Sequence, residues 1–355
     1  MSPDGGTPRP PPIGTAAAPG SARTIEDAAV RSERASGRTV ADPDRAGARG
    51  RDGSPAALLV IGEVVTDVVA RHSAPLAHGT DTAAGIRVLP GGAGANAACW
   101  AAWWGCQDVR LLGRVGRDDS GWHERRLRDA GVTPLLVPDD TAHSATVVVL
   151  VDTTGERTFL SDTGALSHIS PTDWSPELLT GVGHLHLSGY LLFSGGGRRL
   201  ARLALASARS RGIPVSLDPA SAGFIRTRGV DRLLKALDGV DVLIPNADEA
   251  CLLTGRTDPS EAAAALSRRA PLTVVTLGAG GALVAESGSV TARVPAPGAR
   301  AVDSTGAGDA FTGAFLAARL AGADPVTAAA EGCRAGAAAV TLIGGRPAPP
   351  RRPAV

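Results

Sequence analysis

The sequence predicts an α/β protein whose mostly parallel β-sheet carries helices on both faces. Three observations support this fold class. Short apolar runs typical of buried strands alternate with helix-like runs from Leu58 onward. Hydrophobic residues make up 43% of the 355 residues, so a large core can form. No apolar run approaches the ~18 residues of a membrane-spanning helix.

The first 55 residues differ in composition from the rest of the chain. They are rich in Pro, Gly, Ala, Ser and Arg, with acidic residues interleaved and no hydrophobic period. This composition predicts a disordered N-terminal extension over residues 1–55 and one folded domain over residues 56–350. An apolar segment for secretion is missing, and the acidic residues argue against a transit peptide.

The predicted elements of the first half start with a buried strand at residues 57–62. They continue with a helix at 93–104, a strand at 109–112, a helix at 120–130, and strands at 132–137, 145–151 and 157–160. The run from Asp152 to Gly155 is typical of a hairpin turn between the last two strands. Strands within 67–90 and 132–160 interrupt the alternation, so we expect them to form a small β-sheet lid over the main sheet.

The second half alternates more regularly. Strands are expected at 184–187, 214–218, 240–244 and 272–277, and helices at 198–211, 230–236, 247–254 and 260–269. A hairpin at 281–294 and alanine-rich helices at 307–320 and 325–340 complete the domain. In such folds ligands bind beyond the carboxyl ends of the parallel strands, where a small sheet could cover them.

Charge and cysteine content exclude several classes of function. Lys and Arg number 36 and Asp and Glu 35, so the net charge of +1 argues against a protein built to bind nucleic acid or an anionic membrane. The four cysteines form no CxxC pair, which argues against a disulfide scaffold or a zinc ribbon. A reducing, cytoplasmic location fits this cysteine usage.

The most informative segment runs from Asp303 to Phe311, with the sequence DSTGAGDAF. Small residues before a helix let backbone N–H groups converge into an anion site. Asp309 would repel a bound anion, but as a general base it could take a proton from a hydroxyl group beside a moving phosphoryl group. A plain helix cap built from Gly and Asp is the alternative.

A second glycine-rich segment, PGGAGANAA, occupies residues 90–98. Its glycines allow a ligand close to the backbone, and Asn96 can donate and accept hydrogen bonds to hydroxyl groups. The string GxGxxA within it is a weak dinucleotide pattern, and it does not directly follow the first strand. A tight turn without a ligand is the alternative.

Two shorter segments follow predicted strands. Asn246 and Glu249 in PNADE share one helix face and suit the water shell of Mg²⁺, although a capping box explains them equally well. The run TLGAGG at residues 276–281 could hold a nucleotide or turn a hairpin. Asp67, just after the first strand, could bind a hydroxyl group or be a loop acid.

In their order and combination these segments resemble the ribokinase-like, or PfkB, family of carbohydrate kinases, from about residue 58 to about residue 350. The run DSTGAGDAFTGAFL at 303–316 is similar to the family's C-terminal signature, and GGAGANAA at 91–98 resembles its N-terminal signature. The resemblance implies a three-layer sandwich with a small β-sheet lid. It also implies ATP-dependent phosphorylation of a hydroxyl group on a small sugar or sugar derivative.

Residue by residue, the resemblance implies that Asp309 is the catalytic base. It implies an anion hole of Gly306, Ala307 and Gly308; a sugar site of Asp67, Gly91, Gly92 and Asn96; a magnesium and phosphate site of Asn246 and Glu249; a nucleotide site of Thr276, Gly278 and Gly281; and a potassium site of Asp303, the Thr305 carbonyl and Gly344. ATP, Mg²⁺ and K⁺ are the implied cofactors. A homodimer through the edge of the small sheet is the implied assembly.

The chain departs from ribokinases proper at three positions. Ala93 stands where they carry Lys, Ser188 lies where they carry an acid, and Ala348 lacks a hydroxyl that some members have near the cation. The first two differences concern the sugar pocket and leave the phosphoryl-transfer residues intact. Ribose, fructose, a ketodeoxy acid, adenosine and pseudouridine all stay open as substrates.

Three function classes are therefore weighed. A sugar or nucleoside kinase explains all the segments, with few aromatic residues favouring a sugar over a base. A non-catalytic sugar-binding regulator on the same fold would not need the intact GAGD run. A dinucleotide-dependent oxidoreductase depends only on GxGxxA. P-loop and protein kinases are excluded, because GxxxxGK[ST] and the HRD and DFG runs are missing.

Overall fold

The computed structural model describes residues 56–154 and 156–348. The extension predicted over residues 1–55 lies outside the described residues, as do the last two residues of the predicted domain. Every helix among the described residues is too short or too polar to cross a lipid bilayer.

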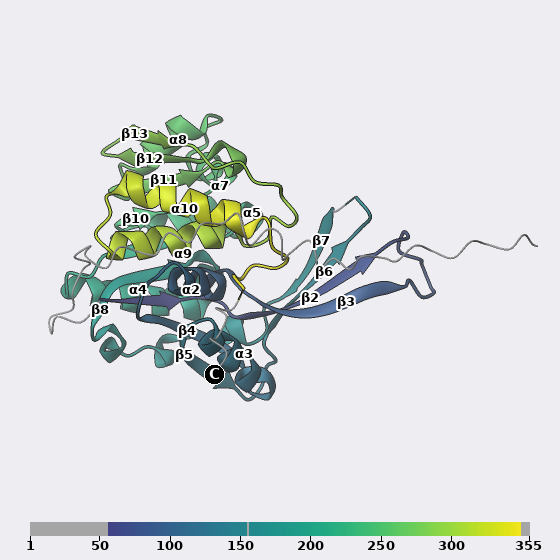
Figure 1. Ribbon diagram of the computed structural model, residues 1–355. Helices are drawn as coiled ribbons and strands as arrows, with labels where there is room; N and C mark the ends of the chain where they lie inside the picture. The colour runs from purple at the N-terminus through teal and green to yellow at the C-terminus, as the bar shows by residue number, and fades with distance from the viewer. Residues whose placement is uncertain (1–55, 155, 349–355) are drawn as a thin grey trace, which may run out of the picture. The chain divides into compact units, whose positions relative to one another are not determined.

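A nine-stranded sheet forms the centre of the domain, in the order β13-β12-β11-β10-β9-β8-β1-β4-β5 (Figure 1). All its pairs are parallel except β11 with β12 and β12 with β13. The strands are β1 Ala57–Ile61, β4 Val109–Gly116, β5 Thr133–Asp139, β8 Val182–Ser188, β9 Val215–Asp218, β10 Val242–Leu243, β11 Leu272–Thr276, β12 Ala282–Glu286 and β13 Ser289–Val294. The prediction of a mostly parallel sheet is confirmed.

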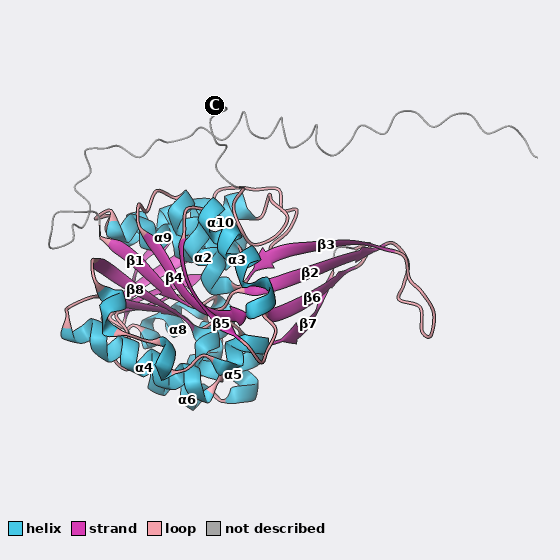
Figure 2. Ribbon diagram, turned by 90° about the horizontal axis from the view of Figure 1, so that it is seen from below, coloured by secondary structure: helices cyan, strands magenta, loops and turns pink. Residues whose placement is uncertain are grey.

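Helices cover both faces of this sheet, which confirms the three predicted layers (Figure 2). One face carries α2 Ala93–Trp103, α3 Arg117–Asp129, α9 Ala307–Leu320 and α10 Pro325–Ala339. The other carries α4 Gly195–Ser210, α5 Ala222–Arg228, α6 Val230–Ala236, α7 Ala247–Thr254 and α8 Pro259–Leu266. Alternate residues of β1 serve the two faces: Leu59 and Ile61 join one core, Leu58 and Val60 the other.

Four further strands make a separate small sheet that projects from the main one (Figures 1 and 2). Its order is β3-β2-β6-β7, with β2 Val65–His72, β3 Ala84–Gly91, β6 Ala145–Val151 and β7 Arg157–Asp162. β6 and β7 form the expected antiparallel hairpin.

The assignment of residues 132–137 to the small sheet was wrong. These residues fall within β5, which pairs in parallel with β4 at the edge of the main sheet. The connection from β4 to β5 runs through helix α3, and a strand–helix–strand unit returns its second strand parallel to the first. After β2 and β3, the chain returns to the small sheet only beyond Asp139, at β6.

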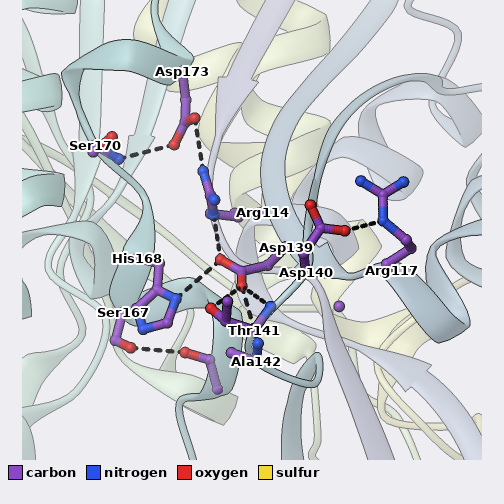
Figure 3. Close-up of polar contacts among 12 residues, drawn as sticks. Arg114, Arg117, Asp139, Asp140, Thr141, Ala142, Ser167, His168, Ser170 and Asp173 are labelled. Atoms are coloured by element: carbon purple, nitrogen blue, oxygen red, sulfur yellow. Dashed lines mark hydrogen bonds and ion pairs between the residues drawn. The ribbon is translucent and has the colours of Figure 1, made fainter.

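An ion-pair network ties down the segment between β5 and β6 (Figure 3). Asp139 accepts hydrogen bonds from Arg114 Nε at 2.8 Å and from the backbone N–H of Thr141 at 2.9 Å, and its carboxylate lies 2.9 Å from His168 Nδ1. Arg114 also donates to Asp173 at 2.9 Å. These contacts hold the pKa of Asp139 well below its usual range, chiefly through Arg114. The segment that leads from β5 into the small sheet is therefore fixed to the main sheet.

Most predicted helices and strands are present, with ends that shift by a few residues. Helix α5, Ala222–Arg228, was not predicted from the sequence. It packs beside α7, and its Phe224 joins an aromatic cluster described below.

The crossing of α2 and α9 is unusually close. A Cβ atom at Gly313 of α9 would lie 2.3 Å from the Ala97 carbonyl oxygen of α2, so only glycine permits this approach. The two helices begin at the two glycine-rich segments that the sequence singled out. Their packing fixes the distance between those segments.

Two histidines lie buried inside the main sheet. His184 and His186 of β8 both contact the hydroxyl of Ser216, at 2.9 and 2.8 Å. Burial lowers the pKa of His184 to about 4 and that of His186 to about 3, below the ordinary value of 6.5. Both are therefore neutral in the folded protein at neutral pH.

This burial predicts acid sensitivity. Because the folded pKa is depressed, the stabilisation is complete above the ordinary pKa and is lost as the pH falls toward the folded value, by up to about 1.4 kcal/mol per pH unit for each histidine. His186→Gln cannot titrate but can still hydrogen-bond to Ser216. We expect its melting temperature to fall less than that of the wild type between about pH 7.5 and about pH 5. His78→Gln, at an exposed position, should behave as the wild type, and equal acid sensitivity of all three proteins would contradict the prediction.

Candidate active site

The N-terminus of α9 provides a ready site for an anion. Gly306 caps the helix in the left-handed region with φ of 74°, and the first intrahelical bond runs from Ala310 N–H to the Gly306 carbonyl at 2.8 Å. The N–H groups of Gly308 and Asp309 therefore precede the helical hydrogen-bond ladder. A Cβ atom at Gly308 would meet nothing within 4 Å, so the space beside this residue is open.

Asp309 and Asn96 meet across this helix end, although 213 positions separate them in the sequence. Asn96 Nδ2 donates a hydrogen bond to Asp309 Oδ2 at 2.8 Å. Burial raises the pKa of Asp309 to about 8; the Asn96 bond opposes the rise, and the charges of Asp218, Glu63 and Asp67 add to it. Asp309 is therefore a carboxylate that can hold or release a proton near neutral pH.

Arg346 orients Asn96 and was not predicted from the sequence. Its Nε donates to Asn96 Oδ1 at 3.3 Å and its Nη2 donates to the Gly91 carbonyl at 2.9 Å. With the amide oxygen occupied, the Asn96 NH₂ group points to Asp309. Trp100 Nε1 donates to the Gly345 carbonyl at 2.9 Å and holds the turn that carries this arginine.

The other residues predicted to bind the sugar lie around Asn96. The Asp67 carboxylate lies against Gly91, where a Cβ atom would come within 2.1 Å of Asp67 Oδ2. Gly92 has φ of 96°, and a Cβ atom there would lie 2.5 Å from the Glu63 carbonyl oxygen. Burial raises the pKa of Asp67 to about 6, against the opposing charge of Arg346. Gly91 and Gly92 thus allow the segments that carry Asp67 and Glu63 to approach the start of helix α2.

A cavity of about 90 Å³ joins four of the predicted segments, since Ala93 of the 90–98 run also lines it. Its lining includes Asp309, Gly308, Asn246, Glu249, Thr276 and Asp218. Gly278 and Gly281 of the predicted nucleotide segment lie outside this lining and shape the turn after β11. Gly281 has φ of 87°, and a Cβ atom there would come within 1.9 Å of the Val294 carbonyl oxygen.

Asn246 and Glu249 form the capping box that was the alternative interpretation of PNADE. The Asn246 N–H donates to Glu249 Oε2 at 2.9 Å, and Asn246 Nδ2 donates to Glu249 Oε1 at 2.7 Å. Burial and the charge of Asp218 raise the pKa of Glu249 to about 8. The cap and the cavity use the same two side chains, so the two interpretations are compatible.

Two further carboxylates were missed by sequence reasoning. Burial raises the pKa of Asp218, at the end of β9, to about 6. Glu63 follows β1, and its Oε2 is buried without a hydrogen-bond partner among the described residues. Both follow the carboxyl ends of parallel strands, and that position was the one available signal.

The carboxylates suit a magnesium–nucleotide complex better than a bare metal ion. Within residues 56–154 and 156–348, no group of three or more His, Cys, Asp or Glu side chains is arranged to hold a metal ion. Asp218, Glu249 and Asp309 nevertheless bring three carboxyl groups to one cavity. Mg²⁺ keeps most of its ligands as water and phosphate oxygens, so these residues fit it.

The residues expected to bind potassium are arranged differently. Asp303 Oδ1 accepts the Thr305 N–H at 2.8 Å, and its Oδ2 accepts the Gly344 N–H at 3.1 Å. Arg157 Nη2 lies 2.8 Å from Asp303 Oδ1. A guanidinium group thus already neutralises this carboxylate, and the arrangement does not fit a free monovalent cation.

Three aromatic rings pack against one another in the segments that follow β8 and β9. Tyr190, Phe193 and Phe224 lie with ring centroids 5.1 to 5.8 Å apart. Burial raises the pKa of the Tyr190 hydroxyl, and the charges of Glu63, Asp309, Asp218 and Glu249 raise it further. Those charges place the ring close to the acidic cluster. The chain has few aromatic residues, yet it concentrates three here.

Comparison with known proteins agrees with this geometry. The model of the pfkB family of carbohydrate kinases matches residues 56–352. A fructokinase of Klebsiella pneumoniae is 32% identical over 310 residues, covering 82% of this chain and 96% of that protein.

Solved structures show the same fold. The aminoimidazole riboside kinase of Salmonella enterica, solved with aminoimidazole riboside and an ATP analog, has 27% identity and a TM-score of 0.68, covering 83% of this chain and 96% of that one. A ribokinase II structure from E. coli with ATP and Mg²⁺ has 24% identity and a TM-score of 0.73, covering 82% and 94%.

Gly306 and Gly308 should differ in their tolerance of a side chain. Ala at position 306 would be forced into the left-handed region and its Cβ would lie 2.4 Å from Gly345 Cα. We expect Gly306→Ala to lose about 1–3 kcal/mol of stability. Gly308→Ala should keep the wild-type stability, because its Cβ faces open space. Urea unfolding of both variants measures this, and equal stabilities would contradict the geometry.

The raised pKa of Asp309 predicts a cost in stability for the ligand-free protein. Because the folded pKa lies above the ordinary value of 3.8, the stabilisation is complete at low pH and is lost as the pH rises through about 8. Asp309→Asn should therefore melt at a higher temperature than the wild type at about pH 8.5, with a smaller difference at about pH 5. The exposed Asp81→Asn is the control. A variant less stable at the higher pH would refute the desolvation argument.

Proposed function

Because the chain belongs to the pfkB family of carbohydrate kinases, we propose that it transfers the γ-phosphoryl group of ATP to a hydroxyl group of a small sugar or sugar derivative. One observation carries the proposal. Asp309 lies at the open N-terminus of α9, is hydrogen-bonded to Asn96, and shares a cavity with Asn246, Glu249 and Thr276. A proton acceptor, a hydroxyl-binding amide and an anion site thus converge.

The proposed mechanism follows from these groups. Asp67, Gly91, Gly92 and Asn96 hold the acceptor sugar so that one hydroxyl faces Asp309. Asp309 accepts the proton of this hydroxyl as it attacks the phosphorus atom. The backbone of Gly306, Ala307 and Gly308 stabilises the charge on the phosphoryl group through the helix N-terminus.

The nucleotide side of the cavity is assigned to the other segments. Asn246 and Glu249 orient the magnesium and phosphate end of ATP, and Thr276, Gly278 and Gly281 border the rest of the nucleotide. When bound, Mg²⁺ would supply positive charge that offsets the negative charge of the phosphate groups. For potassium we derive no role, because Arg157 neutralises Asp303.

The small sheet limits access of water. Asp67 belongs to β2 of this sheet and also borders the sugar site, so the sheet lies against the bound acceptor. Exclusion of water matters because water would compete with the sugar hydroxyl for the phosphoryl group. β3 and β7 form the edges of the sheet, and we retain a homodimer through an edge, in the cytoplasm, as part of the proposal.

A nucleoside acceptor is the alternative. The ring cluster of Tyr190, Phe193 and Phe224 near the acidic groups offers stacking surface for a base, which the low aromatic content alone did not suggest. A non-catalytic regulator is less well supported, because it would not need the desolvated Asp309.

The test is ADP release from Mg·ATP in the presence of a panel of sugars, ketodeoxy acids and nucleosides. We expect one class of sugar to be phosphorylated, and Asp309→Asn to lower kcat by about 10²–10⁴-fold while ATP still binds. Asp81→Asn should keep wild-type turnover. Phosphorylation of nucleosides alone would support the alternative. ATP binding without turnover on any acceptor would favour the regulator.

A further inference from the structure

An arginine of the small sheet contacts the loop that leads into α9. Arg157 is the first residue of β7, and its Nη2 lies 2.8 Å from Asp303 Oδ1. Its Nη1 donates to the Thr305 hydroxyl at 2.7 Å and lies 3.4 Å from the Ser304 hydroxyl. The side chains of Arg157 and Asp303 are only 18% and 11% exposed. The guanidinium group therefore contacts three consecutive residues of one loop.

Strand register places Arg157 on the same face of the small sheet as Asp67, which is predicted to bind the sugar. Asp67 pairs with Val147 of β6, and four residues further along, Arg71 pairs with Val151, which in turn pairs with Arg157. Side chains two or four residues apart along a strand share a face. One face of the sheet thus presents a carboxylate to the acceptor site and a cation to the phosphoryl site.

Asp303 needs a positive partner where it lies. Its two oxygens hold the Thr305 and Gly344 N–H groups and so connect the loop before α9 to the turn that bears Arg346. Burial alone would raise the pKa of Asp303, but those hydrogen bonds and the charge of Arg157 keep it below its ordinary value. The carboxylate is thus ionised close to the anion site. Without a counter-charge it would repel an incoming phosphate.

We propose that Arg157 takes the place of a monovalent cation at Asp303: its guanidinium group neutralises the carboxylate and positions the Thr305–Gly308 backbone, so that turnover needs no added potassium. The proposal builds on the kinase function above and adds its ion requirement. It makes Arg157 a positioning residue, since it acts through Asp303 and Thr305.

The proposal also couples the small sheet to the anion site. The ion-pair network of Asp139 fixes the segment that leads from β5 into this sheet (Figure 3). Arg157, in contrast, belongs to the β6–β7 hairpin itself. Contact of β7 with the α9 loop supplies the counter-charge. A position of the sheet away from this loop would leave Asp303 ionised and unpaired, which disfavours phosphate.

The first test detects potassium binding through thermal stability and needs no substrate. Melting temperatures are compared in potassium chloride and in tetramethylammonium chloride at equal ionic strength. The wild type should melt at the same temperature in both salts, because its cation position is filled. Arg157→Ala should melt at a lower temperature and be stabilised selectively by potassium, and Arg157→Lys should lie between them. Selective stabilisation of the wild type by potassium would overturn the proposal.

The second test measures turnover on whichever acceptor the panel identifies. Wild-type kcat should change less than about twofold between the two salts. The kcat of Arg157→Ala should be at least about tenfold lower than that of the wild type, and potassium should restore part of this loss. Arg71→Gln, an exposed arginine in the same strand row with no contact to Asp303, is the matched control. Wild-type dependence on potassium, or equal kcat of Arg157→Ala and Arg71→Gln, would overturn the proposal.

The two proposals fail in different ways. If the wild type phosphorylates no acceptor, the kinase proposal fails, while the melting temperatures still decide whether Arg157 fills the cation position. If turnover is found but requires potassium, the kinase proposal stands and the role of Arg157 is refuted.

Discussion

The meeting of two helix N-termini at one end of the sheet is the constraint on which the site depends. Gly313 lets α9 approach the Ala97 carbonyl of α2, and this close crossing brings Asn96 within 2.8 Å of Asp309. The hydrogen bond between them joins the acceptor side of the site to the phosphoryl side. Any bulkier residue at position 313 would separate the helices and break this link.

Electrostatics then sets how the site behaves. Asp218, Glu249 and Asp309 line one cavity, and desolvation raises the pKa of each. Such a cluster destabilises the empty protein at alkaline pH, and the positive charge of Mg²⁺ would stabilise its ionised carboxylates. Two arginines complete the arrangement. Arg346 orients Asn96 through its amide oxygen, and Arg157 neutralises the Asp303 carboxylate. Each arginine thus supports a residue next to the site.

Local sequence signals identified most of the helices and strands. They failed where strand pairing decided which sheet a strand joins, or where one side chain has two roles. Residues 133–139 have the composition of a strand, but composition does not say which sheet the strand joins. Asn246 and Glu249 matched both a capping box and a ligand site, and the structure shows the cap at the wall of the cavity. Glu63 and Asp218 were signalled only by their position at the carboxyl ends of strands. Arg157 and Arg346 belong to no recognisable local pattern, since their partners lie far away in the sequence.

The sequence by itself determined the α/β class, the alternation of strands and helices, and the segments around Asn96 and Asp309. It could do so because periodicity and helix-start signals are local properties of the chain. The tertiary structure alone decided which charges meet. The ion pair of Arg157 with Asp303 joins the small sheet to the loop before α9, and the raised pKa of Asp309 depends on burial near carboxylates from distant segments of the chain. Desolvation and long-range pairing are properties of the packed chain, so no local pattern encodes them.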